Sequence, residues 1–551
     1  MIGASLRGCE AKGENVKRYG IAAAALLALT LSVSVIAQEQ DKPAEKEKPA
    51  EKAKAKTSEK SAADKTPSDK APKEAALPEQ SVTQHSVTIG GVPLAYTATA
   101  GTLIVRNEKD EPYARMGYTA YVRKDLAATP SKRPITFAYN GGPGSSSIWL
   151  HMGALGPRRV VTADATATLP PPYQVVDNAY SLIDKTDLVM IDPVGTGFSK
   201  AVGEAKDKDF FGVDPDIESV SRFIKQYVTD NGRWNSPKYL LGESYGTTRS
   251  AGVVDYLQSR EGMAFNGVVL VSVAVDLGAI FAVPGNDRPF PLYLPSYAAT
   301  AWFHKVLPNP PQDLDPWLVE VRKFAASDFA SALAEGDRLP ADRRAQIIKR
   351  LHDYTGLSEQ YLDLANMRVP EGQYFQELMR QHRITVGRLD SRFSGITFDP
   401  LAKETEEDPQ ANAIASAFTA AFLDWYHEGL KFGQGKTYMV EAEVYKYWDF
   451  KHKSPGAPFP LPTLTNTGID LSHAMAFNPH LRVLVLNGIY DLATPFFATE
   501  SMVSQLHLEK SLQSHLEMKY YPAGHMMYVH EPSLKAFKAD VADFIGRTSR
   551  Q

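Results

Sequence analysis

Short runs in which apolar and polar residues alternate open the globular part of the chain. Alternation over residues 86–89, 92–97, 102–106 and 117–122 is typical of strands with one buried face. Two glycines, at 90 and 91, and a polar stretch after 106 separate these runs, as turns do. The pattern predicts antiparallel strands and hairpins at the leading edge of a mixed sheet.

Runs rich in apolar residues further along the chain predict more strands, at 135–139, 188–191, 239–241, 267–271, 481–486 and 516–520. An amphipathic helix should follow the second of these runs, since apolar residues recur at helical spacing from Ile217 to Val228. We expect Asp214 and Pro215 to cap this helix. A second helix is predicted over 247–260. Strands that alternate with helices indicate a parallel sheet.

The alternation of strand and helix stops near residue 277 and returns near 481. Helical patterns fill the interval, at 296–307, 315–332, 341–352, 358–364 and 411–430. The simplest interpretation is a helical lid over 278–478, inserted between two parts of a sheet-containing core at 81–277 and 479–551. A closing helix is expected over 532–545.

The amino end has the layout of a secretory signal peptide. Lys17 and Arg18 precede an apolar run from 21 to 36, and Ala37 closes a small-residue cleavage pattern. The run is shorter than the about 20 residues of a membrane span, so a retained anchor is the less favoured alternative. We expect a signal peptide at 1–37 and a periplasmic or secreted protein, with no stable membrane span after cleavage.

Composition refines this picture. The only cysteine, Cys9, lies in the part to be removed, so the exported chain would have no disulfide, which suits a bacterial periplasm. Residues 38–80 are nearly all Lys, Glu, Ala, Pro, Ser, Asp and Thr and are expected to form a disordered linker, with a spacer or cell-wall contact as the alternative. A net charge of -4 over 551 residues gives no indication of a nucleic-acid partner.

The first candidate for chemistry is Ser244, at the centre of a Gly-x-Ser-x-Gly motif between the run 239–241 and the helix 247–260. A nucleophile held at a sharp strand-to-helix turn needs small neighbours, and the helix end beside it favours a developing oxyanion. The motif alone is weak evidence for a nucleophile, because a glycine-bounded turn with a surface serine has the same sequence.

Other residues at predicted strand ends strengthen this candidate. Asp491 follows the run 481–486 and His525 follows 516–520, which gives the order Ser, Asp, His. That is the order of catalytic triads in the α/β-hydrolase fold, with a mostly parallel central sheet, and we expect this fold here. Taken singly, Asp491 could cap a helix and His525 could be an ordinary loop histidine.

Two glycine-rich loops complete the pattern, at 140–147 and 192–199. The first has free N–H groups of the kind that an oxyanion hole needs, although a tight turn before a serine-rich helix cap is the alternative. With the segment 242–245 and the late Asn-Gly-x-x-Asp and Gly-His segments, these loops resemble the serine carboxypeptidases, peptidase family S10. The resemblance runs from about residue 137 to the carboxyl end, apart from the lid.

The resemblance implies roles for four further residues. The backbone N–H groups of Gly142 and Tyr245 would form the oxyanion hole, and Asn140 with Glu243 would bind the terminal carboxylate of a peptide substrate. Two carboxylates share a site only when one is protonated, so the resemblance favours activity at acidic pH.

The chain also departs from the family pattern. Ala138 and Ala154 stand where a tryptophan and a partner glutamate are expected, and Ser145 replaces a loop cysteine. Residues 246–249 differ as well, and Arg249 or a lid residue is a candidate replacement for the lost carboxylate contacts.

From these residues we expect an exported serine carboxypeptidase that acts through an acyl-enzyme. An esterase or acyltransferase on the same triad is the main alternative, and a non-catalytic binding protein on this fold is a third. No metal or cofactor is predicted, because His525 and His530 lack a third ligand nearby and no phosphate-binding motif is present. Oligomeric state and side-chain preference stay open.

Overall fold

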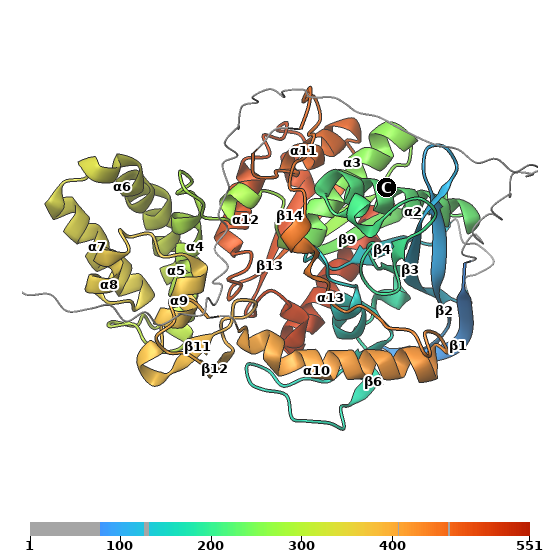
Figure 1. The fold of residues 1–551 in the computed structure, drawn as a ribbon, viewed down its shortest axis with the longest axis horizontal. Helices are drawn as coiled ribbons and strands as arrows, with labels where there is room; N and C mark the ends of the chain where they lie inside the picture. The colour runs from blue at the N-terminus through green and yellow to red at the C-terminus, as the bar shows by residue number, and fades with distance from the viewer. Residues whose placement is uncertain (1–77, 126–131, 406, 461–462, 551) are drawn as a thin grey trace, which may run out of the picture. The chain divides into compact units, whose positions relative to one another are not determined.

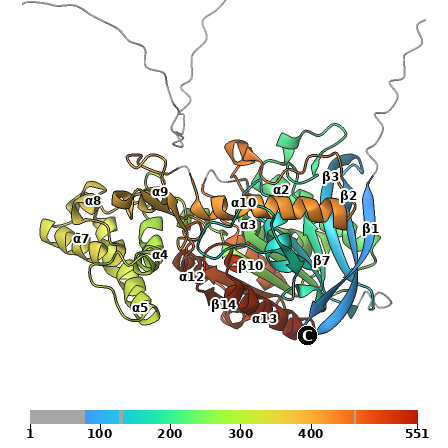
Figure 2. The same cartoon turned by 90° about the horizontal axis from the view of Figure 1, so that it is seen from below.

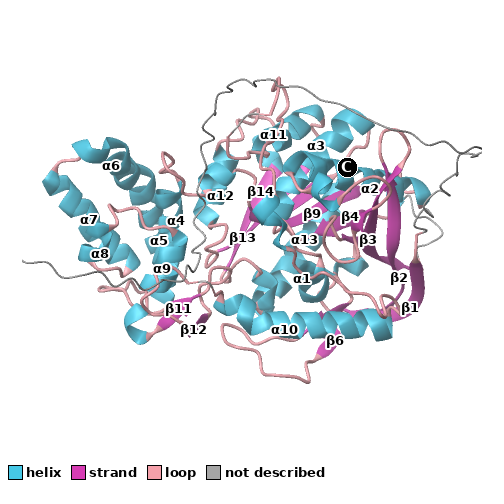
Figure 3. Ribbon diagram, in the orientation of Figure 1, coloured by secondary structure: helices cyan, strands magenta, loops and turns pink. Residues whose placement is uncertain are grey.

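A ten-stranded mixed sheet is the centre of the computed structural model, which describes residues 78–125, 132–405, 407–460 and 463–550 (Figure 1). The spatial order is β1-β2-β3-β7-β4-β9-β10-β13-β14, with β8 paired to β3. The strands, magenta in Figure 3, are β1 (Gln80–Ile89), β2 (Val92–Arg106), β3 (Pro112–Arg123), β4 (Ile135–Tyr139), β7 (Asp187–Ile191), β8 (Lys200–Ala201), β9 (Lys238–Ser244), β10 (Gly267–Val273), β13 (Arg482–Gly488) and β14 (Leu516–Tyr521).

The directions of the strands match the sequence pattern. β1, β2, β3 and β7 pair antiparallel, whereas the six strands from β7 to β14 are all parallel. The chain therefore has the expected α/β-hydrolase fold. Because the parallel strands share one direction, the loops after β4, β7, β9, β13 and β14 emerge at one edge of the sheet.

Helices cover both faces of the sheet (Figures 1 and 2). One apolar layer includes side chains of α2 (Val213–Asp230), α3 (Tyr245–Glu261), α11 (Gly468–Phe477) and α12 (Phe496–Ser504). The other includes α1 (Ile148–Leu150), α10 (Pro409–Asp424) and α13 (Glu531–Thr548). Along β4, Phe137 and Tyr139 join the first layer and Ala138 joins the second, as the two-residue period of a strand requires.

The N-cap of helix α2 lies two residues earlier than predicted. Gly212 is its N-cap and Val213 its first residue, so the expectation that Asp214 and Pro215 cap it is wrong. The Asp214 carboxylate lies in the first turn, where it complements the helix dipole, and its Oδ1 lies 2.5 Å from Nδ1 of His452. A proline in this turn is tolerated because its missing N–H would have no intrahelical partner.

The interval predicted as a lid holds two kinds of structure. Its first part forms the inserted helices α4 (Pro289–Phe303), α5 (Leu314–Phe324), α6 (Ala330–Glu335), α7 (Ala341–Thr355), α8 (Glu359–Leu364) and α9 (Glu371–Glu377), and the hairpin β11 (Ile384–Val386) and β12 (Ser394–Ile396). Its second part returns to the sheet, since α10 packs in one layer and α11 contacts α3 in the other.

The segments expected as signal peptide and linker, 1–37 and 38–80, lie outside the described residues apart from 78–80. β1 begins at Gln80, so the regular fold starts at the end of the expected linker. Among the helices of the described ranges, none is both long and apolar enough to cross a membrane.

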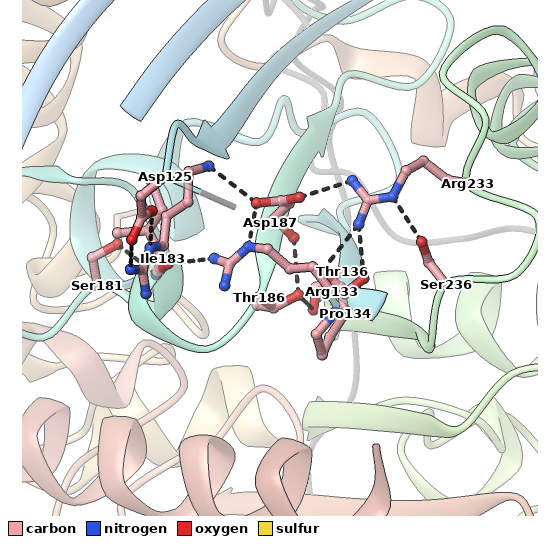
Figure 4. A network of polar contacts seen from close by, with 11 residues as sticks. Asp125, Arg133, Pro134, Thr136, Ser181, Ile183, Thr186, Asp187, Arg233 and Ser236 are labelled. Carbon is pink, nitrogen blue, oxygen red and sulfur yellow. Dashed lines mark hydrogen bonds and ion pairs between the residues drawn. The ribbon is translucent and has the colours of Figure 1, made fainter. Parts of the chain in front are cut away.

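A buried network of ions holds the edge of the sheet at which β4 and β7 begin (Figure 4). Asp187, the first residue of β7, accepts hydrogen bonds from Nε of Arg133 at 2.6 Å and from Nη1 of Arg233 at 2.8 Å. Arg233 also donates to the backbone carbonyl of Arg133 at 2.8 Å. All three side chains are buried. One carboxylate therefore pairs with two guanidinium groups that connect the loops before β4 and β9.

Replacing this carboxylate should destabilise the fold strongly. Asp187→Ala leaves two buried cations without their acid, and loss of one partner of a buried ion pair costs about 3–5 kcal/mol. Urea denaturation of Asp187→Ala measures the loss, and Asp363→Ala, which removes the exposed partner of Arg344, is the matched control. We expect the control to change the free energy of unfolding little. Equal, small changes in both variants would contradict a structural role for the network.

Candidate active site

Ser244 occupies the sharp turn between β9 and α3. It is the last residue of the strand and the N-cap of the helix, with φ of 60° and ψ of -130°. A positive φ strains a residue that carries a Cβ, and strain of this kind collects at functional sites. The serine is partly exposed, whereas the rest of β9 is buried. This strand, turn and helix have the geometry of a nucleophile elbow.

Backbone segments approach this turn so closely that side chains are excluded. A Cβ on Gly242 would lie 2.2 Å from the carbonyl oxygen of Gly246, and a Cβ on Gly141 would lie 2.4 Å from the backbone nitrogen of Tyr245. Gly141 is near because Tyr139 of β4 pairs with Gly242 of β9. The glycines in both motifs thus let the loop after β4 contact the elbow.

Asp491 and His525 are joined by a hydrogen bond. Nδ1 of His525 donates to Oδ2 of Asp491 at 2.8 Å, and both side chains are buried. The carboxylate also accepts from the N–H groups of Ala493 and Thr494, each at 2.8 Å, and from the Thr494 hydroxyl at 2.7 Å. Because Asp491 accepts from Nδ1, the other ring nitrogen of His525 can serve as a base.

The backbone of His525 is connected to the strand beside Ser244. The hydroxyl of Ser272 donates to the carbonyl oxygen of His525 at 2.7 Å. Ser272 lies in an irregularity of β10, where Val273 pairs with Ser244. Among the described residues no hydrogen bond joins Ser244 to His525. In ligand-free enzymes this contact is often long and tightens when substrate binds.

The surroundings of His525 raise the pKa of its imidazole. Burial alone would lower this pKa, but the charge of Asp491 and the hydrogen bond to it raise it, and the Glu243 charge adds to the effect. The positive charge of Arg388 opposes the rise. A base must be neutral to accept a proton, so proton transfer to His525 would fall off as the pH drops below this raised pKa.

Two backbone N–H groups beside Ser244 are available to a ligand. Tyr245 is the first residue of α3, so its N–H has no acceptor one turn earlier within the helix. Gly142 has φ of 103°, and its N–H has no acceptor in the part of the chain that the structure describes. The assignment of these two groups to an oxyanion hole stays a prediction.

Asn140 and Glu243 form a buried pair behind the serine. Nδ2 of Asn140 donates to Oε1 of Glu243 at 2.7 Å, and Oδ1 of Asn140 accepts the N–H of Leu150 at 3.0 Å. Within the described residues, Oε2 of Glu243 makes no hydrogen bond of normal geometry, but the hydroxyl of Tyr528 lies close enough to this carboxyl to lower its pKa. Burial raises the pKa of Glu243 to about 7, against the opposing charge of His525. In weakly acidic solution this carboxyl is therefore protonated and can donate a hydrogen bond.

Arg249 does not face a substrate, so its expected role as a replacement carboxylate contact is wrong. Its side chain is fully buried, donates through Nε to Oδ2 of Asp216 at 2.7 Å, and donates through Nη1 to the carbonyl oxygen of Asn140 at 2.8 Å. It lies over the rings of Tyr139 and Tyr245. Arg249 thus supports the loop after β4 from beneath.

Two further aspartates near the site support its loops, and sequence analysis assigned no role to either of them. Asp192, in the predicted glycine-rich loop, accepts the N–H of Ser147 at 2.9 Å and supports the end of the first loop. Asp390 of the insertion accepts the N–H of Gly524 at 2.9 Å and is paired with Arg392. Sequence reasoning missed Asp390 because neither periodicity nor a motif marks a contact between the insertion and the histidine loop.

Metal chemistry finds no support in the side chains that can be described. Across the described ranges, no group of three or more His, Cys, Asp or Glu residues has the geometry to hold a metal ion. The chemistry available at the elbow is that of a hydroxyl, an imidazole, two carboxyl groups and backbone N–H groups.

Solved structures that resemble the chain are remote in sequence. A proline iminopeptidase from Mycobacterium smegmatis is 14% identical, with a TM-score of 0.31, and the match covers 85% of this chain and 99% of that one. A lipase in its open form is 12% identical, with a TM-score of 0.32 and coverage of 82% and 98%. The peroxisomal α/β-hydrolase of Saccharomyces cerevisiae is 11% identical, with a TM-score of 0.31 and coverage of 85% and 89%.

Comparisons by sequence give one positive result. No curated protein sequence matches the chain significantly. The model of the serine carboxypeptidase family matches residues 107–270, which include the loop after β4 and Ser244 but not Asp491 or His525. This match and the fold support a serine hydrolase. The resemblance expected from the motifs is thus confirmed over residues 107–270, the part of the chain that matches the serine carboxypeptidases.

Proposed function

We propose that the protein is an exported serine carboxypeptidase that removes residues from the carboxyl end of peptides. The observation that carries the proposal is the buried carboxyl of Glu243, held by Asn140 directly before Ser244, with a pKa raised by burial to about 7. A protonated carboxyl next to a nucleophile can donate a hydrogen bond to a terminal carboxylate, whereas an ionised carboxyl would repel it.

The reaction would proceed in two steps on Ser244. His525 removes the hydroxyl proton as the serine oxygen attacks the last peptide carbonyl, and Asp491 keeps the ring in the required tautomer. The N–H groups of Gly142 and Tyr245 stabilise the oxyanion. His525 then gives the proton to the leaving amine. In the second step His525 takes a proton from the water that attacks the acyl-enzyme, and it returns this proton to the Ser244 oxygen as the shortened peptide leaves.

An esterase or acyltransferase on the same residues is the second candidate. Ala138 and Ala154 favour it, because both are buried alanines at positions where the resembled family has residues that support carboxylate binding. Export rests on residues 1–37 and stays a proposal, with the periplasm or the extracellular space as the location.

Three matched substrates separate these candidates: a blocked dipeptide with a free carboxyl end, its amide and its simple ester, assayed from pH 4 to 8. We expect a ratio of kcat/KM for acid over amide well above one at low pH, which falls as Glu243 ionises with a midpoint near 7. Ionisation of His525 changes kcat/KM for the acid and the amide by the same factor, so its effect cancels in the ratio. Glu243→Gln, which stays neutral, should make the ratio independent of pH.

Glu443→Gln is the matched control, because Glu443 is an exposed glutamate paired with Lys446. This variant should keep the wild-type pH dependence. Equal turnover of acid and amide at every pH, with turnover of the ester, would rule out the carboxypeptidase and leave a general serine hydrolase.

A further inference from the structure

The segment that follows β11 in the insertion is bound directly to both loops that carry Asp491 and His525. The carbonyl oxygen of Arg388 accepts the N–H of Leu492 at 3.0 Å, and the carbonyl oxygen of Leu389 accepts the N–H of His525 at 2.6 Å. A Cβ on Gly524 would lie 2.3 Å from the latter oxygen, so the two segments are in backbone contact. Arg388 is therefore fixed beside the candidate reaction centre.

The side chain of Arg388 has the properties of a ligand-binding group. It is exposed, and within the described ranges it has no hydrogen bond and no ion pair. Its charge nevertheless interacts electrostatically with His525, with Glu371 at the start of α9 and with Tyr293 of α4. The nearby arginine Arg392 differs, since it is buried and paired with Asp390.

A free guanidinium beside a reaction centre fits a carboxylate better than any neutral group, because it can form two parallel charge-assisted hydrogen bonds. The candidate pair of Asn140 and Glu243 provides no positive charge, and Arg249 is engaged in the core. Of Arg249, Arg388 and Arg392, Arg388 alone is exposed and interacts electrostatically with His525.

We propose that Arg388 binds a carboxylate of the substrate next to the scissile bond and so determines specificity. The inference rests on the proposed function, because it requires that Ser244 and His525 act on this substrate. The carboxylate has two possible sources, the carboxyl end of the peptide and an acidic side chain beside the bond that is cleaved.

Two substrate pairs distinguish these sources. The first pair is a blocked dipeptide of neutral residues as free acid and as amide, and the second is the simple esters of blocked glutamate and blocked glutamine. Arg388→Gln should lower kcat/KM for the carboxylate-bearing member of one pair about 10- to 100-fold, mainly through KM, with the neutral member nearly unchanged. Arg388→Lys, which keeps the charge but not the planar fork, should lose less.

Arg383→Gln is the matched control, since Arg383 is another exposed arginine of the insertion and no electrostatic contact with His525 is seen for it. It should behave as wild type. A loss confined to the first pair identifies the terminal carboxylate, and a loss confined to the second identifies an acidic side chain; both outcomes support the proposal.

If Arg388→Gln keeps the wild-type preference for the carboxylate-bearing substrates, the assignment of Arg388 as their binding residue is overturned. The proposed function would then still stand. Failure of the wild-type protein to hydrolyse any of the four substrates would overturn both. Where the terminal carboxylate is the ligand, inhibition by a blocked neutral amino acid with a free carboxyl group gives a second readout, because its inhibition constant should rise in Arg388→Gln by the same factor as KM.

Discussion

Ser244→Ala is expected to lower kcat on the best substrate by about 10⁴- to 10⁶-fold, with little change in stability. Removal of the nucleophile from a serine triad leaves only binding and oxyanion stabilisation, which accounts for residual rates of this size. The side chain lies at a strained, partly exposed turn and packs little, so the fold should not depend on it.

The measurement is kcat with a purified sample, beside a thermal unfolding curve. Ser259→Ala is the matched control, because Ser259 lies in the same helix and, among the described residues, its hydroxyl bonds only to the carbonyl of Asp255. A Ser244→Ala variant that keeps more than a tenth of the wild-type rate would show that another residue is the nucleophile.

Asp491→Asn is expected to lower kcat about 10⁴-fold. The asparagine oxygen can keep the hydrogen bonds from Ala493 and Thr494, but its NH₂ group would face Nδ1 of His525. The imidazole would then be held with its proton on the other nitrogen, which could no longer accept the serine proton.

The pH profile of the residual activity provides the sharper readout. Loss of the negative charge removes the interaction that raises the pKa of His525, so the acidic limb of the profile should move to lower pH. Asp540→Asn is the control, because Asp540 lies in α13 and contacts Tyr521 and Lys519 of β14. This variant should leave both the rate and the profile unchanged. An unchanged profile in Asp491→Asn would place the partner of His525 elsewhere.

Local patterns predicted most of the sheet, because the faces of a strand that are buried determine which of its positions are apolar. β4, β7, β10 and β13 are buried at every or nearly every position and read as apolar runs, and β1 to β3 read as alternation. The elbow was also readable, since close backbone approach at Gly242 and Gly141 admits only glycine.

Contacts between segments that are far apart in the chain could not be predicted from the sequence. The hydrogen bonds of the 388–391 segment to the loops of Asp491 and His525 depend on where the insertion folds back, which no local pattern encodes. Arg249 was misjudged for the same reason: its place in the motif suggested the substrate, but the 3.6-residue turn of α3 directs it toward Asp216. The start of α2 was misjudged because Gly212 competes with Asp214 as N-cap.

The inserted helices were predicted from the helical spacing of their apolar residues. That spacing does not show where the insertion ends and the helices that cover the sheet begin. α11 lies in the interval predicted as a lid, yet it packs on α3. Only the tertiary contacts distinguish a helix that covers the sheet from one that lies beyond it.

The most direct test of this account is covalent labelling with a fluorophosphonate, followed by intact mass and peptide mapping. A fluorophosphonate reacts with a serine that a neighbouring base has activated. We predict one adduct per chain on Ser244, absent from Ser244→Ala and formed far more slowly in Asp491→Asn. A folded wild-type protein that takes no label, or takes it at another serine, would contradict the assignment of Ser244, Asp491 and His525 as a catalytic unit.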